Sequence, residues 1–449
     1  MTEKVKSALL FFLVVLSLYL TYQLWYGEQP AALLAEDVYE RIVVEKPRPL
    51  AQVITPAVAA VAADDEFYIL REGDSDYYLL WESTSQMLQE LSQEMISENQ
   101  TLPEGARLLV HLIFKPALPV GVELPWMTGA FPLVVSKLEL YSVDHATWLV
   151  LSTETPNSPA LQMHLPADNV SALLEVTAQI RASDKIAYTA LDRNQLAGLT
   201  DRKLDLGEQI YVPLEKIYLD TLPLKAEAID RELLLKTFFI DYSLARMVEE
   251  KDGNLIYTDG ERGLRLTNYG LEYTYPRMDE ANVTLLYSEA LTNCSSIISY
   301  HGGWPTGLRL ESLAKSGWGQ TASYAAEWKQ YYQGYQFHSN KLTRAYFNDR
   351  GLIHYTRALY SVEGSNSAGE EQHPVAEWSA ALQKAVELFA VLQPVSDSTL
   401  RLDALELSYV VRSIGGSLRA EPAWFVKING IKFLLEADSL AMIKEEDLL

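Results

Sequence analysis

An apolar segment near the N-terminus constrains the fold of this chain more than any other feature. Residues 7–26 are almost entirely apolar, and Gln23 is the only strongly polar side chain among them. About 20 such residues in a helix cross the hydrocarbon core of a bilayer. Lys4 and Lys6 precede the segment, and positively charged flanks stay in the cytoplasm. We therefore predict a single-pass protein of the cell membrane, with residues 1–6 cytoplasmic and the C-terminal bulk extracellular.

The alternative for this segment is a cleaved signal peptide. Such peptides have an apolar core of only about 7–15 residues, followed by small residues at the cleavage site. Here the apolar run is longer and ends in Trp25 and Tyr26, and aromatic rings of this kind settle at membrane interfaces. We therefore favour an uncleaved transmembrane helix.

Two small residues mark one face of the predicted transmembrane helix. Ser17 and Thr21 lie four residues apart, and small residues at this spacing let two membrane helices approach closely. We name Ser17 and Thr21 as candidate partner contacts. The alternative is that both hydroxyls bond to the backbone of their own helix.

Composition limits the partners that the rest of the chain can have. The chain has 449 residues and a net charge of −23, and an acidic surface repels nucleic acid and anionic lipid headgroups. We expect no nucleic-acid partner. The single cysteine, Cys294, cannot form an intramolecular disulfide, which indicates a bacterium that does not rely on oxidative folding.

Length suggests two or three domains after the transmembrane helix, and patterning indicates an α+β protein. We place a juxtamembrane connector at residues 27–50, an N-terminal α+β domain at 51–195, a middle α+β domain at 196–300 and a C-terminal α+β domain at 301–449. The last two domains each read as antiparallel sheet plus helix, and we expect them to resemble each other.

Local patterns predict individual elements. We expect strands at residues 67–70, 77–81, 107–114, 255–258, 264–266, 271–273, 335–347 and 352–360, and a hairpin over 133–153. We expect helices at residues 83–96, 170–182, 226–237, 322–332 and 374–391, and a helical turn at 243–250. Asn429-Gly430 between two alternating apolar runs is the strongest short-range signal for a β-hairpin.

No pattern in the chain predicts catalysis or metal binding. Residues 252–254 and 259–261 resemble fragments of calcium loops, but the spacing of an EF-hand is missing, and Asp-Gly pairs are ordinary turn residues. Cys294 with His301 nearby could act as a nucleophile, but the flanking Ile297 and Ile298 indicate a core strand and therefore a buried, inert thiol. We predict no catalytic residue, no cofactor and no metal.

Three stretches carry a resemblance to a known family. The first is Leu-Thr-Tyr-Gln-Leu-Trp at residues 20–25. The second runs through residues 239–246 and 257–266, and the third joins His-Gly-Gly-Trp at 301–304 to residues 331–335 and 351–357. With these motifs the chain resembles the YycH family of membrane-anchored accessory regulators in Gram-positive bacteria. The motif residues that we take as mostly structural are Asp241, Arg246, Tyr257, Asp259, Gly260, Gly263, His301, Gly302, Gly303 and Trp304.

The resemblance implies a non-enzymatic regulator in signal transduction, with three extracytoplasmic domains of which the last two would share their fold with YycI. Its partners would be the sensor histidine kinase (WalK/YycG) of the two-component system that controls cell-wall metabolism, and a YycI-like membrane protein. Arg262 and Arg265, within the second motif, are candidate partner contacts by this reading. The alternatives are an anchored cell-wall hydrolase, or a sensor that binds a wall fragment in a deep apolar pocket.

Overall fold

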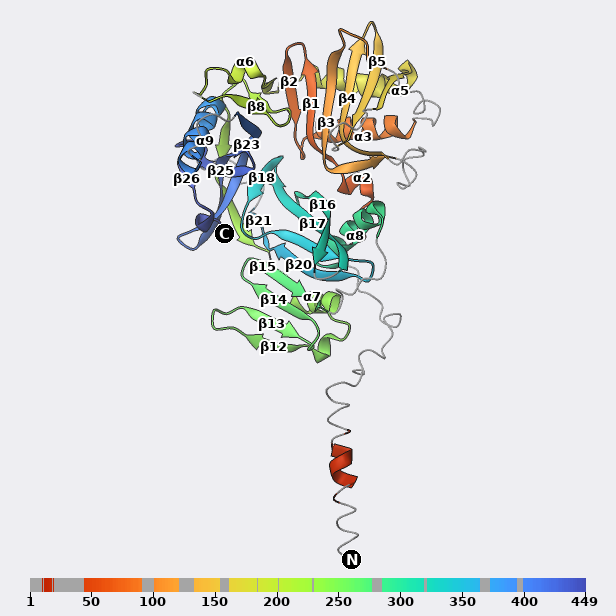
Figure 1. Ribbon diagram of the computed structural model, residues 1–449, viewed down its shortest axis with the longest axis vertical. Coiled ribbons are helices and arrows are strands. Elements are labelled where there is room, and N and C mark those ends of the chain that lie inside the picture. The colour runs from red at the N-terminus through yellow and green to blue at the C-terminus, as the bar shows by residue number, and fades with distance from the viewer. Residues whose placement is uncertain are drawn as a thin grey trace, which may run out of the picture.

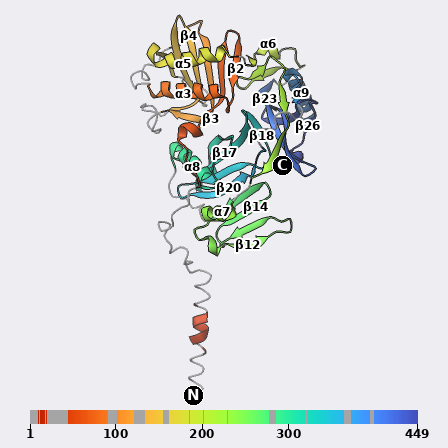
Figure 2. The ribbon, with the colours of Figure 1, turned by 180° about the vertical axis from the view of Figure 1, so that it is seen from behind.

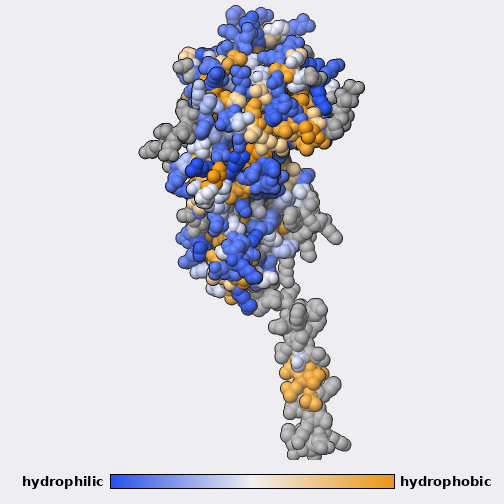
Figure 3. All heavy atoms as spheres, turned by 90° about the vertical axis from the view of Figure 1, so that its left-hand side faces the viewer, coloured by the Kyte–Doolittle hydropathy of each residue, from blue (hydrophilic) through white to orange (hydrophobic). Residues whose placement is uncertain are grey.

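The computed structural model describes most of the chain beyond the N-terminal segment. The described residues are 10, 12–17, 19, 44–90, 101–120, 133–153, 161–183, 185–200, 202–227, 230–276, 285–318, 321–363, 372–393 and 399–449. Of the predicted transmembrane segment, residues 12–17 are helical, and their apolar side chains are exposed, as the orange band near the end of Figure 3 shows. Thr21 and most of the predicted connector lie outside the described residues. Among the described residues, no helix combines the length and apolar character needed to cross a bilayer.

The N-terminal part of the body is an eight-stranded antiparallel sheet in the order β6-β5-β4-β3-β1-β2-β7-β9. Helices α3 and α5 lie side by side on one face of it (Figures 1 and 2). The elements are α2 (Leu50–Val53), β1 (Pro56–Ala63), β2 (Glu66–Leu70), α3 (Ser75–Gln89), β3 (Arg107–Val120), β4 (Leu133–Val143), β5 (Ala146–Ser152), β6 (Leu161–Leu165), α5 (Ala167–Arg181), β7 (Ala187–Ala190), α6 (Arg193–Leu196) and β9 (Tyr211–Pro213).

The rest of the body is built on a 16-stranded sheet. This sheet has two parts, which are connected by the pairing of β17 with β18. One part has the order β12-β13-β14-β15-β20-β19-β17, with β16 also on β17. Its elements are α7 (Arg231–Phe238), the 3-10 helix η3 (Tyr242–Leu244), β12 (Arg246–Glu249), β13 (Leu255–Thr258), β14 (Gly263–Thr267), β15 (Gly270–Thr274), α8 (Tyr287–Tyr300), β16 (Leu308–Trp318), β17 (Thr321–Tyr332), β19 (Thr343–Phe347) and β20 (Leu352–Ala358).

The second part of this sheet has the order β18-β23-β24-β11-β21, extended by β25 and β26 beside β24 and by β8 beside β23. Helix α9 packs against β24, and β10 pairs with β22 separately. The bounds are β8 (Leu204–Leu206), β10 (Tyr218–Asp220), β11 (Leu222–Ala226), β18 (Tyr335–His338), β21 (Tyr360–Val362), β22 (Gln372–Pro374), α9 (Trp378–Leu392), β23 (Leu400–Ile414), β24 (Ser417–Ile428), β25 (Ile431–Glu436), β26 (Met442–Ile443) and η5 (Glu445–Asp447).

One hydrophobic core runs from the N-terminal sheet into the middle of the molecule. It includes Leu80 and Leu112 from the first sheet and its helix, and Cys294 and Trp328 from α8 and β17. Helix α2 contacts α8, and β3 contacts β16. The N-terminal sheet therefore packs directly against the second sheet and shares a hydrophobic core with it.

The α+β class and many predicted elements are confirmed. The meander over residues 255–274 forms as predicted, and so do the β4–β5 hairpin, α5 and α9. In the predicted C-terminal hairpin, Asn429 and Gly430 adopt φ of +49° and +79°, which is the left-handed geometry that a two-residue hairpin turn requires.

The prediction of a strand at residues 77–81 is wrong, and so is the helix start near Ser83. Residues 75–89 form one helix, α3, whose N-cap is Asp74, with its carboxylate accepting a hydrogen bond from the Asp76 N–H. Tyr77, Leu80, Trp81 and Leu88 are buried at helical spacing. The capping aspartate and this period outweigh the strand propensity of the aromatic residues.

Two predicted helical segments are strands instead. Residues 322–332 belong to β17, where Tyr324, Ala326 and Trp328 are buried on one face and Glu327 and Lys329 alternate with them. The alternating period, together with pairing to β16 and β19, overrides helix propensity. Residues 246–249, inside the predicted helical turn, form β12 and pair with β13.

The prediction of antiparallel sheet in the last two domains holds for most of the described strand pairs, with two exceptions. Strands β8 and β18 both pair with β23 in parallel, because they arrive from separate segments rather than through hairpins. Strand β11 pairs with β24, and β15 with β20, so pairings cross the boundary predicted between residues 300 and 301. That boundary, and the similarity of the two domains, stay predictions.

Candidate functional site

The residues of the second family motif gather in one place, the meander from η3 to β14. Asp241 precedes η3, Arg246 opens β12, Tyr257 lies on β13, and Gly263 opens β14. Asp259, Gly260 and Arg262 form the turn between β13 and β14, and Arg265 follows on β14. The structure thus brings together eight of the predicted site residues.

Several of these residues have structural tasks. The Asp241 carboxylate accepts hydrogen bonds from Ser243 N (3.0 Å) and Oγ (2.6 Å) and thereby caps η3. The Asp259 carboxylate accepts from the N–H groups of Glu261 and Arg262 at 3.0 and 2.8 Å. Gly260 has φ +95°, where a side chain would be strained. Tyr257 is buried. Asp259 and Gly260 therefore stabilise the turn between β13 and β14.

The two arginines of this motif differ in their surroundings. Arg262 is buried, with its guanidinium 4.5 Å from the centre of the Tyr275 ring and 3.9 Å from Asp259. Arg265 has a side chain that is 40% exposed, and its Nη2 lies 2.7 Å from a carboxylate oxygen of Glu250. Only Arg265 is placed to meet a partner at the surface, and that role stays a prediction.

The same meander ends in an open, apolar edge. Among the described strands, β12 pairs with β13 on one side and with none on the other. Tyr242, Leu244, Met247 and Val248, on η3 and β12, are 40%, 60%, 58% and 54% exposed. We call these four residues the β12 surface. Exposed apolar side chains beside an unpaired strand edge are typical of a protein-binding site.

The hydrogen bonds between β12 and β13 determine which N–H and C=O groups of β12 point away from the sheet. The Glu250 N–H donates to the Asn254 carbonyl across the β12–β13 turn at 2.8 Å. Residues of an antiparallel strand alternate between facing the partner strand and facing away. Because Glu250 faces β13, Glu249 and Met247 direct their N–H and C=O groups outward. The edge therefore offers donors and acceptors to an added strand.

The His-Gly-Gly-Trp motif lies at the C-terminal end of α8 and forms a second junction. The imidazole of His301 stacks on Phe238, with ring centres 4.4 Å apart. The buried Arg357 on β20 donates from Nη1 to the carbonyls of Gly303 (2.8 Å) and His301 (3.3 Å). Gly302 has φ +115°, and a Cβ there would lie 2.7 Å from Arg357 Nη1. The backbone carbonyls of this motif therefore accept hydrogen bonds from a buried guanidinium.

This loop also holds the chain that follows the predicted transmembrane segment. The Trp304 N–H donates to the Glu45 carboxylate at 2.8 Å, and the Arg48 guanidinium lies 4.8 Å from the centre of the Trp304 ring. The Ser295 hydroxyl donates to the Arg48 carbonyl at 2.8 Å, and Glu45 N donates to the Ser299 carbonyl at 3.1 Å. We call these contacts of residues 45–48 the connector clamp.

Sequence reasoning missed the connector clamp and Arg357. Arg357 closes the Gly-Leu-Ile-His-Tyr-Thr-Arg stretch quoted for the third motif, so a signal was present, but its cationic side chain gave no sign of burial. Glu45 and Arg48 fall in a segment that looked like a plain linker. Their partners lie about 250 residues away in sequence, beyond the reach of local patterns.

The residues considered for nucleophilic or metal chemistry are not arranged for it. Cys294 is completely buried as predicted, but in helix α8 and not in a core strand. Loss of hydration raises the pKa of its thiol well above the usual range. Across the part of the chain that the structure describes, no group of three or more histidine, cysteine or acidic side chains is placed to hold a metal ion. Ser17 is exposed in the described helical stretch, and Thr21 cannot be placed.

Known proteins resemble this chain in sequence over its N-terminal part and in fold over most of its length. A family model described as the N-terminal domain of YycH protein matches residues 3–154, and no curated protein matches the chain. The crystal structure of YycH from Bacillus subtilis shares the fold with a TM-score of 0.58 at 11% identity, over 90% of this chain and 99% of that one. An uncharacterized protein from Eubacterium rectale reaches a TM-score of only 0.36 at 11% identity, over 55% of this chain and 91% of that one. Residues 3–154 therefore match the family of YycH N-terminal domains, and the chain shares the fold of Bacillus subtilis YycH along most of its length.

Proposed function

We propose that this chain is a non-enzymatic regulator, anchored in the cell membrane by residues 7–26, with its body extracellular. It modulates the sensor histidine kinase (WalK/YycG) that controls cell-wall metabolism and acts together with a YycI-like membrane protein. The match of residues 3–154 to the YycH N-terminal domain and the fold shared with Bacillus subtilis YycH support this proposal, as do the apolar segment and its flanking Lys4 and Lys6.

The observation that carries the proposal is the β12 surface. A regulator without reaction chemistry acts by binding one state of its partner better than another, and it needs a surface for that contact. Strand β12 offers unpaired backbone groups, with Met247 and Val248 exposed on its two faces and Tyr242 and Leu244 exposed on η3 just before it. A partner strand added to β12 would supply main-chain hydrogen bonds and cover those side chains. Burial of each stabilises a complex by about 1.5–3 kcal/mol at most.

Proline on β12 tests this mode of contact. Proline is tolerated on an edge strand where the N–H faces away from the sheet, so Glu249→Pro should leave the β12–β13 pairing intact and remove one outward donor. We expect full-length Glu249→Pro to lose most of the kinase or YycI-like protein that the wild type retains on purification from membranes. Glu249→Ala, which keeps the N–H, is the matched control.

The outcome distinguishes the proposal from its rivals. If Glu249→Pro retains its partners as well as Glu249→Ala does, contact through the β12 edge is excluded. If the purified wild type cleaves cell-wall material, the hydrolase alternative replaces the regulator.

A further inference from the structure

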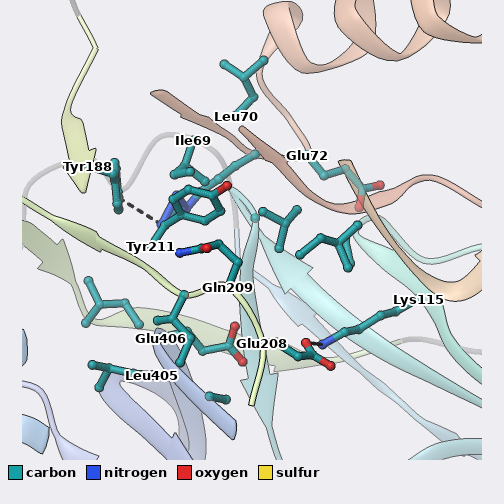
Figure 4. A pocket seen from close by; sticks show the side chains of 18 of the residues that line it. Ile69, Leu70, Glu72, Lys115, Tyr188, Glu208, Gln209, Tyr211, Leu405 and Glu406 are labelled. Carbon is teal, nitrogen blue, oxygen red and sulfur yellow. Dashed lines mark hydrogen bonds and ion pairs between the residues drawn. The ribbon is translucent and has the colours of Figure 1, made fainter. Parts of the chain in front are cut away.

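A polar cavity of about 160 Å³ lies where the N-terminal sheet meets the second sheet. Its walls come from segments far apart in the chain, including β2, the segment before β9, β16 and β23 (Figure 4). A cavity of roughly 150 Å³ can hold a molecule the size of benzene. The space therefore suits a ligand of about six to ten non-hydrogen atoms.

The charged groups around the cavity are only partly paired. The lining includes the cations Arg71, Lys115 and Arg309 and the carboxylates of Glu72, Glu208, Asp403 and Glu406. Lys115 lies 3.5 Å from Glu208, and both side chains are about half exposed, so this pair stands at the solvent side. Asp403 is held by Arg401 at 2.9 Å and accepts from Gly430 N at 2.7 Å.

Two carboxylates have no close protein partner among the described residues. Glu72 Oε2 is buried without a hydrogen bond, and Glu406 is exposed, with Lys115, Lys329 and Arg309 acting on it only through longer-range attraction. Figure 4 shows Glu72 and Glu406 on different sides of the pocket, with Gln209 and Tyr211 between them. Glu406 is exposed to solvent at the mouth of the cavity. Partial loss of hydration raises the pKa of its carboxyl, against the attraction of Lys115.

Arg71 supplies the complementary charge. Its guanidinium lies 4.3 Å from the centre of the Tyr335 ring, and Nη2 donates to the Tyr188 hydroxyl at 3.1 Å. Tyr188 belongs to the first sheet and Tyr335 to the second. A Cβ on Gly334 would lie 2.3 Å from Arg71 Cβ, so close packing fixes the arginine between them. A guanidinium has five N–H donors. Among the described residues no carboxylate lies within ion-pair distance of this one, and Glu406 attracts it from farther away across the cavity.

We propose that the cavity binds a small zwitterion of the amino-acid class, with its ammonium group on Glu406 and its carboxylate on Arg71. Both groups of such a ligand find an unpaired group of opposite charge, whereas a simple anion or a simple cation would satisfy only one. Because Arg71 follows β2 and Glu406 lies on β23, the ligand would bridge the two sheets. This binding activity is separate from the partner contact at the β12 surface.

Alanine and its two fragments provide the test. Ethylamine is alanine without the carboxylate, and propionate is alanine without the ammonium group. We expect calorimetric titration of the full-length protein in detergent to show binding of L- or D-alanine and at least about tenfold weaker binding of both fragments, because each lacks one charged hydrogen-bonding group. This comparison uses the wild type and does not depend on how a variant folds.

Variants assign the site. Glu406→Gln and Arg71→Gln should each weaken alanine binding at least about tenfold, while Glu66→Gln, which changes an exposed carboxylate on β2, should leave it unchanged. The proposal is overturned if neither alanine isomer binds, or if ethylamine binds as tightly as alanine. It is also overturned if folded Glu406→Gln and Arg71→Gln both bind alanine like the wild type.

Discussion

Replacement of Arg357 by methionine should strongly destabilise the junction between α8 and β20. The side chain is 2% exposed, donates to two carbonyls of the His-Gly-Gly-Trp loop, and lies 3.7 Å from Glu227. Methionine keeps much of the apolar stem but leaves both carbonyls without their donor. A hydrogen bond from a charged group contributes about 1.5–3 kcal/mol. The ion pair adds little, because Glu227 is partly exposed. We expect a loss of about 3–5 kcal/mol.

Hydrogen exchange combined with urea unfolding measures this loss. Peptides covering residues 298–304 should exchange much faster in Arg357→Met, since the Gly303 N–H bonds to the Ile298 carbonyl inside this loop. Arg265→Met is the matched control, because Arg265 forms a surface ion pair with Glu250, and such pairs contribute about 0–1 kcal/mol. Equal destabilisation by the two variants would refute the structural role given to Arg357.

Further predictions concern the connector clamp, pH dependence and the transmembrane segment. Glu45→Ala removes the acceptor of the Trp304 N–H and should cost about 1–2 kcal/mol locally, seen as faster proteolysis at residues 44–49; unchanged protection would contradict the clamp. Burial, reinforced by Lys329 and Lys432, lowers the pKa of His338 to about 3, below the roughly 6.5 of an unfolded histidine. The unfolded chain then takes up its proton first, so stability is full above about pH 6.5 and falls as the pH drops toward 3. Between pH 7 and 4.5 the wild type should lose on the order of 2 kcal/mol of unfolding free energy because of His338, and His338→Gln should not show this part of the loss. If the pH dependence of urea unfolding is the same in both proteins, His338 is not its cause. Ser17→Leu with Thr21→Leu should weaken kinase regulation at unchanged membrane insertion and protein level, whereas normal regulation with an unrelated membrane helix would assign all contact to the extracellular body.

Local chemistry predicted the turns and meanders of this fold well. Asn429-Gly430 and Asp259-Gly260 specify their turns through backbone geometry that few other residues adopt, so neighbouring strands follow from short stretches of sequence. Propensity failed at residues 77–81 and 322–332, where capping by Asp74 and pairing with β16 and β19 decide the outcome. The cap is a local signal that the sequence reading missed, whereas strand pairing is a tertiary effect that overrides weak local preferences.

The functional regions were less accessible to sequence reasoning. The family motif led to the right meander, but the exposed edge of β12 was hidden because its apolar residues looked like a helical turn. The connector clamp and the cavity are made by segments that meet only after folding, such as Glu45 with Trp304 and Arg71 with Tyr335. Residue spacing along the sequence does not predict contacts between segments that are so far apart in the chain.

Photo-crosslinking in living cells tests the central claim most directly, namely that this regulator acts through contact at the β12 surface. A photoreactive amino acid would replace Val248 on β12, and Tyr78 on α3, an exposed position on the N-terminal sheet's helical face, serves as the control. We expect position 248 to yield an adduct with the sensor kinase or the YycI-like protein, and position 78 to yield none. Adducts of equal yield from both positions, or none from position 248 in a fully regulated strain, would contradict the account.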